Sequence, residues 1–155
     1  MAKFKRGDLF NHLDEFDIVF ITTNAKVTNG KLAMGAGIAK TASDTFPELP
    51  ELFGKQIKFI LDKKSNDTYG IAFVNDVNKQ RHKIAAFQTK GTNPYDISDI
   101  RLIRYATECL IDYAMNRPDL RIALNYPGIG LGQLNKSDVE PIVKMLPDNV
   151  TIWEL

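Results

Sequence analysis

Short apolar runs rich in β-branched residues alternate along this sequence with segments of helical periodicity. Residues 17–23 (DIVFITT) form one such run, and Ile38, Ala42 and Phe46 recur at helical spacing after a polar, glycine-bearing loop. Strands that alternate with helices are typical of α/β proteins, in which helices cover a central sheet. We therefore predict a three-layer α/β/α fold with a central mixed β-sheet, formed by residues 1–155 as a single domain.

The other elements are expected from the same patterns. Strands are predicted over residues 3–6, 69–74, 84–89, 121–126 and 150–153, and the polar tract 77–82 (VNKQRH) is predicted to be a hairpin loop. Helices are predicted over 51–61, from a cap at Asp96 or Ser98 to about residue 116, and after a cap at Ser137. The expected buried residues are Leu52, Ile57, Ile60 and Leu61 in the first of these helices and Ile100, Ile103, Leu110 and Ala114 in the second.

Composition narrows the class of protein. Of the 155 residues, 44% are hydrophobic and 25% are charged, which is the profile of a globular protein with its own core. The net charge of +1 argues against a general nucleic-acid binder, because such a protein needs a clustered basic face. The single cysteine, Cys109, excludes a disulfide framework and is expected to pack in a helix. We expect a cytoplasmic monomer without metal, cofactor, membrane segment or leader peptide.

Two glycine-bearing loops each follow a predicted strand and precede a predicted helix. The first covers residues 24–40 (NAKVTNGKLAMGAGIAK), and the second covers residues 128–134 (GIGLGQL). Glycines let backbone N–H groups approach phosphate oxygens, and the N-terminus of the helix that starts at Ile38 favours an anion. In an open α/β sheet, ligands bind where such loops leave the carboxyl ends of the strands. The loops therefore predict a phosphate site, the alternative being two tight strand-to-helix turns.

Neither standard nucleotide-binding motif fits these loops. A P-loop ending at Gly30 and Lys31 needs glycine at position 25 and serine or threonine at position 32, but the chain has Ala25 and Leu32. A dinucleotide fingerprint that starts at Gly35 lacks its third glycine. The pattern indicates a different nucleotide-binding α/β fold.

Several segments, in this order and spacing, resemble the macrodomains, a family that binds ADP-ribose. The matching segments are GDLF at 7–10, Asn24-Ala25 with Asn29, MGAGIA at 34–39, GIGLGQL at 128–134 and TIWEL at 151–155. The sequence looks most similar to the terminal ADP-ribose glycohydrolases and to the antitoxin macrodomains that remove ADP-ribose from DNA. Both carry a lysine directly after a strand that ends in aliphatic-x-Thr, and Lys90 takes this place in FQTK at 87–90.

The resemblance implies a partner, which is ADP-ribose or an ADP-ribosylated macromolecule, with nucleic acid involved only as a modified substrate. Asp8 would accept a hydrogen bond from the adenine amino group, and Asn24 and Asn29 would bond to ribose hydroxyls. Trp153 would either stack on adenine or pack in the core. The implied ligand-binding residues are Asp8, Leu9, Asn24, Asn29, Met34, Gly35, Ala36, Gly37, Ile38, Gly128, Ile129, Gly130, Leu131, Gly132 and Trp153.

The resemblance also implies that Lys90 is catalytic in a hydrolase that removes ADP-ribose from a protein or DNA conjugate. Its amine would attack the opened aldehyde form of the distal ribose as a Schiff base, or its charge would assist the reaction. An ordinary lysine is protonated at neutral pH and is then not a nucleophile. A nucleophilic Lys90 would need an apolar environment that favours the neutral amine, and we expect Phe87 and Ile129 to provide it. One departure bears on this mechanism. Gly132 stands where the glycohydrolases carry an aspartate that helps to resolve the lysine adduct.

Two other functions remain open from the sequence. A binding module without turnover fits the glycine at position 132, whereas Lys90 favours an enzyme. Dephosphorylation of ADP-ribose 1″-phosphate would need a general base to activate water, and neither glycine loop contains a histidine.

Overall fold

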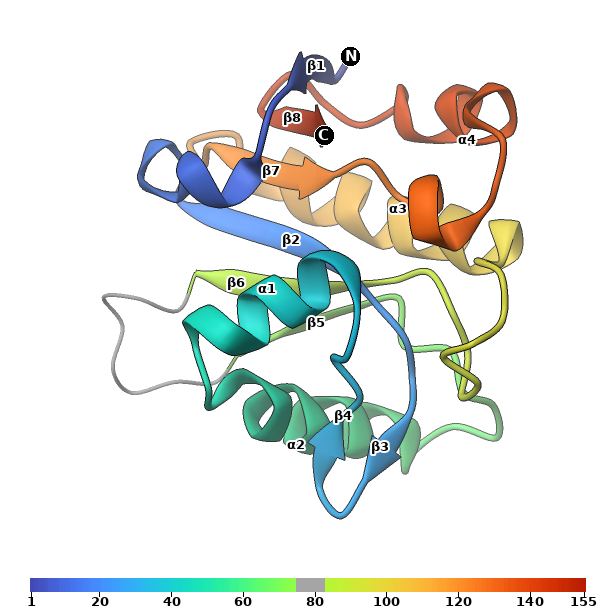
Figure 1. The fold of residues 1–155 in the computed structure, drawn as a ribbon. Helices are drawn as coiled ribbons and strands as arrows, with labels where there is room; N and C mark the ends of the chain where they lie inside the picture. The colour runs from blue at the N-terminus through green and yellow to red at the C-terminus, as the bar shows by residue number, and fades with distance from the viewer. Residues whose placement is uncertain (75–82) are drawn as a thin grey trace.

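The computed structural model describes residues 1–74 and 83–155 and contains a six-stranded sheet (Figure 1). The strands lie in the order β1-β8-β7-β2-β6-β5. β5 is antiparallel to β6, whereas every other neighbouring pair is parallel, so the predicted mixed sheet is confirmed. The strands are β1 (Lys3–Arg6), β2 (Ile18–Thr23), β5 (Ile71–Phe73), β6 (Ile84–Gln88), β7 (Ile122–Asn125) and β8 (Val150–Glu154).

Helices cover both faces of this sheet and complete the predicted three layers (Figure 1). One face carries α1 (Gly37–Thr45) and α2 (Leu49–Leu61), and the other carries α3 (Ile100–Asn116) and α4 (Lys136–Val143). The first glycine-bearing loop contains a small hairpin, β3 (Val27–Thr28) with β4 (Lys31–Leu32), where the sequence predicted irregular chain. Short 3₁₀ turns follow β1 and β7: η1 (Leu9–Asn11), η2 (Leu13–Glu15) and η3 (Gly130–Gly132).

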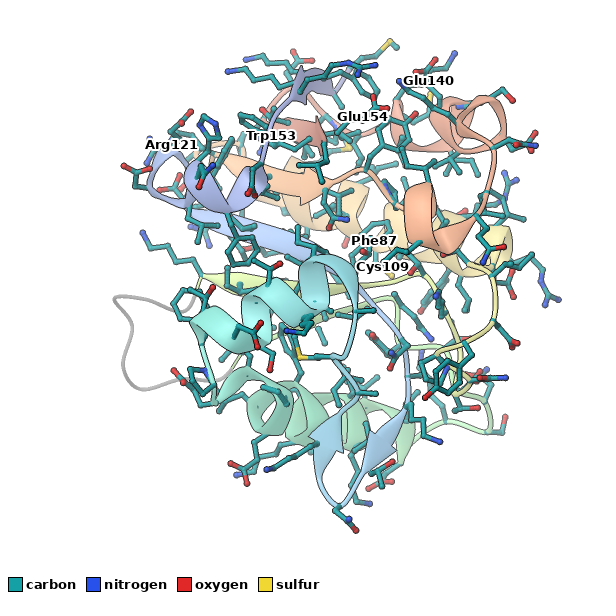
Figure 2. All side chains as sticks on the ribbon, viewed as in Figure 1. Phe87, Cys109, Arg121, Glu140, Trp153 and Glu154 are labelled. Carbon is teal, nitrogen blue, oxygen red and sulfur yellow. The ribbon has the colours of Figure 1, made fainter. Side chains whose placement is uncertain are left out.

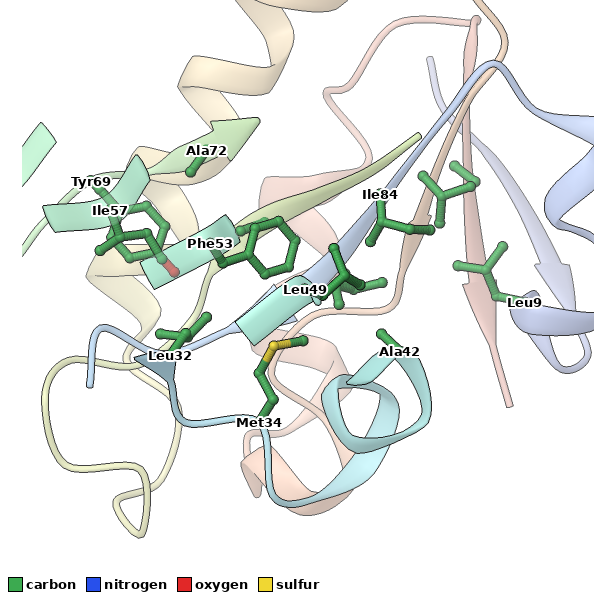
Figure 3. Close-up of a cluster of buried hydrophobic side chains, with 14 of the residues drawn as sticks. Leu9, Leu32, Met34, Ala42, Leu49, Phe53, Ile57, Tyr69, Ala72 and Ile84 are labelled. Atoms are coloured by element: carbon green, nitrogen blue, oxygen red, sulfur yellow. The ribbon is translucent and has the colours of Figure 1, made fainter. Parts of the chain in front are cut away.

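The central strands are buried on both faces, because their side chains alternate between two hydrophobic cores. In β2, Val19 and Ile21 belong to the core under α1 and α2, whereas Phe20 belongs to the core under α3 and α4. Figure 3 shows the first core, to which Phe53 of α2 and Ile84 of β6 both contribute. Burial on both sides explains why this strand is a continuous apolar run in the sequence rather than an alternating one.

α2 buries part of the predicted side and further residues nearer its start. It begins two residues earlier than expected, with Pro50 in its first turn, so the apolar stripe starts at Leu49 and continues at spacings of four residues. The buried residues are Leu49, Phe53, Gly54 and Ile57, so the prediction of Ile57 is confirmed. Ile60 and Leu61 are partly buried and pack against the core, and Leu52 is partly exposed.

α3 has a different cap from the two predicted. Asp99 caps the helix, and its carboxylate accepts a hydrogen bond from the backbone nitrogen of Arg101 at 2.9 Å. Neither Asp96 nor Ser98 takes that role, because the chain becomes helical only after residue 99. The predicted inward positions Ile103, Leu110 and Ala114 are confirmed as buried, and Ile100 is partly buried.

The remaining sequence predictions have mixed outcomes. α4 starts after Asn135, not after Ser137, and its cap makes no side-chain hydrogen bond. The tract 77–82, predicted to be a hairpin loop, lies outside the described residues. In the ranges 1–74 and 83–155, no helix has both the length and the apolar character needed to cross a membrane.

Gly54 allows the β3–β4 hairpin to pack directly on α2. A Cβ atom at this position would lie 2.2 Å from the carbonyl oxygen of Gly30 in the hairpin turn. Because the obstructing atom is backbone, a side chain at position 54 would displace the whole hairpin and the loop that carries it.

We expect Gly54→Ala to lower the free energy of unfolding by about 1–3 kcal/mol, the usual cost of overpacking, although alanine is the better helix former. Urea unfolding measures this change. Lys55→Ala, at an exposed position of the same helix, is the control and should cost less than about 0.5 kcal/mol. An unchanged stability for Gly54→Ala would contradict the close contact.

Candidate ligand-binding site

A cavity of about 1040 Å³ lies at the carboxyl ends of the five parallel strands. Parallel strands end at the same edge of a sheet, so five segments far apart in sequence meet there. The residues contributed by the strand ends are 7–10 after β1, 22–24 at the end of β2, 89–90 after β6, 125–126 after β7 and 153–155 at the end of β8. The two glycine loops contribute residues 33–39 and 128–132, and Thr41, Pro94, Tyr95 and Ser98 line the rest of the wall.

The cavity lies between β2 and β7, where the order in which the chain adds strands to the sheet reverses. β2 leads through α1 and α2 toward β5 and β6, whereas its neighbour β7 leads through α4 toward β8 on the opposite side. Two adjacent loops that leave in opposite directions open a crevice between them, which is the usual ligand position in an α/β sheet.

A side-chain pair bridges β2 and β7 where their backbone pairing has ended. Asn125 Oδ1 accepts a hydrogen bond from the backbone nitrogen of Thr22 at 2.9 Å, and Asn125 Nδ2 donates to Thr22 Oγ1 at 3.0 Å. The last backbone pair between these strands is Phe20 with Leu124. Both bridging residues line the cavity, so this pair connects the two strands from which the glycine loops depart.

The two glycine loops approach each other across the crevice. Gly37, at φ +59°, opens α1, and a Cβ atom there would lie 3.2 Å from Leu131 Cδ1 of the second loop. The residue before it, Ala36, offers no side-chain acceptor to the free N–H groups of the first helical turn. These donors, at the positive end of the helix dipole, are suited to an anion.

Asp8 and Trp153 line the cavity at the ends of β1 and β8 (Figure 2 labels Trp153). The exposed Asp8 carboxylate accepts one hydrogen bond, from the backbone nitrogen of Phe10 at 3.0 Å. The Trp153 ring is 4% exposed and stacks on His12, with 4.4 Å between the ring centroids. Since His12 covers one face of the indole, core packing accounts for the burial of this tryptophan.

The two predicted asparagines have different positions. Asn24 lines the cavity, but its amide organises the loop, because Nδ2 donates to the Ala33 carbonyl at 3.0 Å and Oδ1 accepts from the Lys26 nitrogen at 2.9 Å. Asn29 lies in the turn of the β3–β4 hairpin, at φ +53°, and does not line the cavity. All the other residues that the sequence predicted for this site line it.

Lys90 follows β6 and is half-buried at the cavity wall. Its Nζ donates to the carbonyl oxygen of Pro94 at 3.2 Å. The expectation that Phe87 desolvates this lysine is wrong, because alternation along β6 turns the fully buried Phe87 toward α3 (Figure 2). Ile129, the other apolar residue expected there, does line the cavity.

Gln88, which the sequence analysis did not single out, holds the main chain of Lys90. The side chain is fully buried, and its amide uses its full hydrogen-bonding capacity. Oε1 accepts from the nitrogens of Tyr69 at 2.7 Å and Gly70 at 3.1 Å, and Nε2 donates to the carbonyls of Asp67 at 2.8 Å and Lys90 at 3.1 Å. Lys90 is thereby tied to the segment that precedes β5.

Tyr69 extends this network to the end of β2. Its hydroxyl donates to the carbonyl of Asn24 at 2.6 Å and lies 2.6 Å from Thr23 Oγ1. Burial raises the pKa of the Tyr69 phenol, so the group stays protonated and able to donate. The sequence does contain a signal for Gln88 and Asn125, because a polar residue in an otherwise apolar strand needs buried partners.

Among the described residues, neither a metal site nor a reactive cysteine is found outside the cavity. They contain no group of three or more histidine, cysteine or acidic side chains able to hold a metal ion. Cys109 lies half-buried in α3 (Figure 2), where burial raises the pKa of its thiol and makes the nucleophilic thiolate less accessible.

The architecture and the position of the cavity define a macrodomain fold, and comparison with solved structures confirms it. The chain is similar to the macrodomain of Mycobacterium tuberculosis DarG, with 17% identity and a TM-score of 0.69, over 99% of this chain and 97% of that one. It is similar to the macrodomain of Thermus aquaticus DarG, with 21% identity and a TM-score of 0.63, over 99% and 97%. At these identities the likeness establishes the fold.

A third similar structure contains a ligand. Thermosipho africanus DarTG, solved in complex with ADP-ribose, has 18% identity and a TM-score of 0.72; the match covers all of this chain and 42% of that longer one. No protein-family model matches the sequence, and no curated protein matches it.

We expect Gln88→Glu to make stability depend on pH. A carboxylate there would be desolvated and would face two carbonyl oxygens, so its pKa would be raised in the folded state above its value in the unfolded chain. The variant should be most stable at acidic pH and lose stability as the pH rises through neutrality.

Urea unfolding at about pH 5 and about pH 8 measures this difference. Gln56→Glu, on the partly exposed side of α2, is the matched control and should show no such loss. A Gln88→Glu variant with the pH profile of the wild type would contradict the buried network.

Proposed function

We propose that this chain binds ADP-ribose in the cavity at the carboxyl ends of its parallel strands. The observation that carries the proposal is the pair of glycine loops facing each other across the crevice, with the N-terminus of α1 between them. Backbone donors on both sides suit a diphosphate. The volume of about 1040 Å³ admits a ligand of this size, since small-molecule sites range from about 300 to 1,000 Å³.

Each part of the ligand has a candidate partner in this cavity. Asp8 retains acceptor capacity for the adenine amino group, since its carboxylate accepts one hydrogen bond from the protein. The glycine loops bind the diphosphate, and Lys90 contacts the distal ribose. The fold shared with the ADP-ribose complex of Thermosipho africanus DarTG supports this choice of ligand.

We further propose that the chain hydrolyses ADP-ribose conjugates of protein or DNA, with the Lys90 ammonium assisting electrostatically. The contact from Lys90 Nζ to the Pro94 carbonyl is that of a hydrogen-bond donor. A nucleophilic role would require the amine to release this carbonyl and lose a proton. A cation beside the distal ribose would stabilise negative charge that develops on the departing group.

A second candidate function, a reader of ADP-ribose without turnover, is favoured by Gly132. The position has no carboxylate to activate water or resolve an adduct. Phosphatase activity has weaker support, because no histidine lines the cavity among the described residues; His12 lies against Trp153 instead.

We expect ADP-ribose to bind with micromolar affinity and at least tenfold more tightly than ADP, because ADP lacks the distal ribose. Calorimetric titration with ADP-ribose, ADP and AMP measures this. Equal affinity for ADP-ribose and ADP would show that the distal ribose is not recognised. If ADP-ribose did not bind at all, the proposal would be wrong.

We expect Lys90→Ala to slow release of ADP-ribose from a modified protein or DNA oligonucleotide by about 100-fold, the scale of removing one electrostatic group from a catalytic site. The affinity for free ADP-ribose should change by no more than about threefold, since Lys90 is proposed to act on charge that develops only as the bond to the departing group breaks. Multiple-turnover product release and calorimetry measure the two effects.

Lys144→Ala, an exposed lysine at the end of α4, is the control and should leave both quantities unchanged. Unchanged release by Lys90→Ala would contradict the assignment of Lys90. Absence of release by the wild type, with ADP-ribose still bound, would establish the reader instead.

A further inference from the structure

Gly132 differs from the other glycines of the second loop, because its backbone does not require a glycine. Gly128 and Gly130 have φ values of +80° and +66°, whereas Gly132 has no positive φ. A Cβ atom at position 132 would instead lie 2.4 Å from Ser98 Oγ and 3.2 Å from Ser98 Cβ. A side chain here would have to displace the neighbouring serine hydroxyl, whereas the chain conformation itself would allow one.

Ser98 joins the Lys90 segment to the second glycine loop. Its backbone nitrogen donates to the Gly132 carbonyl at 2.9 Å, and the next residue, Asp99, donates to the Thr89 carbonyl at 2.8 Å. Ser98 is therefore fixed between Gly132 on one side and the residue preceding Lys90 on the other. It is 3% exposed, and it lines the cavity.

The Ser98 hydroxyl has no hydrogen-bond partner among residues 1–74 and 83–155. The side chain is largely buried, but its oxygen is not among the polar atoms that are both fully buried and unpartnered, so the hydroxyl is open to solvent in the cavity. A ligand group that bonds to it would replace that solvent contact. At a cavity wall, a bound ligand can supply the missing partner.

We propose that Ser98 contacts the ligand directly and that its hydroxyl bonds to a hydroxyl of the distal ribose of ADP-ribose, beside Lys90. This inference rests on the proposed binding of ADP-ribose. A serine hydroxyl can donate one hydrogen bond while it accepts another, and a sugar hydroxyl has the same capacity. Gly132 is then required because any side chain there would displace the Ser98 hydroxyl.

Ser98→Ala tests the contact, because it removes the hydroxyl and keeps both the Cβ atom and the backbone hydrogen bonds. We expect the affinity for ADP-ribose to fall about 3- to 10-fold, the usual effect of losing one neutral hydrogen bond, with the affinity for ADP unchanged. Thr92→Ala, an exposed hydroxyl of the same loop that does not line this cavity, should change neither. Calorimetry gives the affinities, and thermal unfolding checks that each variant is folded.

Two results for Ser98→Ala would overturn the proposal. One is an unchanged affinity for ADP-ribose. The other is an equal loss of affinity for ADP and ADP-ribose, because it would place the contact on the part that the two ligands share. The wild-type titration separates this failure from that of the proposed function. A wild type that binds ADP-ribose, with a variant that binds it equally well, rejects Ser98 alone.

A double-mutant cycle tests whether Gly132 acts through Ser98. Gly132→Ala should lower the affinity for ADP-ribose by the same factor as Ser98→Ala, because the added methyl displaces the hydroxyl. The variant with both substitutions should lose no more than either alone. Losses that multiply would contradict the coupling, and if Gly132→Ala does not fold, the Ser98→Ala result decides the proposal.

Discussion

The candidate site depends on the parallel pairing of β2 with β6 on one side and β7 on the other. Parallel pairing places the carboxyl ends of these strands at one edge, and the chain then leaves β2 and β7 in opposite directions. The crevice arises from this divergence before any side chain is considered. Burial of β2 on both faces fixes its register, because a slip of one residue would move Val19 and Ile21 into the core that holds Phe20, and Phe20 into theirs, and disrupt the packing of both.

Much of the fold could be predicted from the sequence, because local patterns carry it. The strand at 17–23 and the glycine loops were recognisable from residue type and spacing. The start of α2 was not, since Pro50 suits a first helical turn as readily as it suits a break before one. The prediction therefore missed Leu49 at the start of the buried stripe, whereas Ile57 was predicted correctly and Ile60 and Leu61 pack at the edge of the core.

The site was predictable where a residue lies in a loop beside a strand end, and less so where a role depends on contacts across the fold. Lys90 and the glycine loops do line one cavity. Phe87 was misplaced because its direction depends on the strand's pairing and not on its nearness in sequence to Lys90. The opposition of Ser98 and Gly132, 34 residues apart, leaves no local signal.

The Gln88 network makes the edge of the sheet part of the site. Tyr69 and Gly70 immediately precede β5, an edge strand of three residues paired on one side alone, and an edge is where a sheet usually frays first. Because one buried amide bonds both to these residues and to the main chain of Lys90, β5 cannot separate without leaving that amide unsatisfied. The edge strand and the Lys90 loop should therefore open as one cooperative unit, so the local order of the site extends to the edge of the sheet.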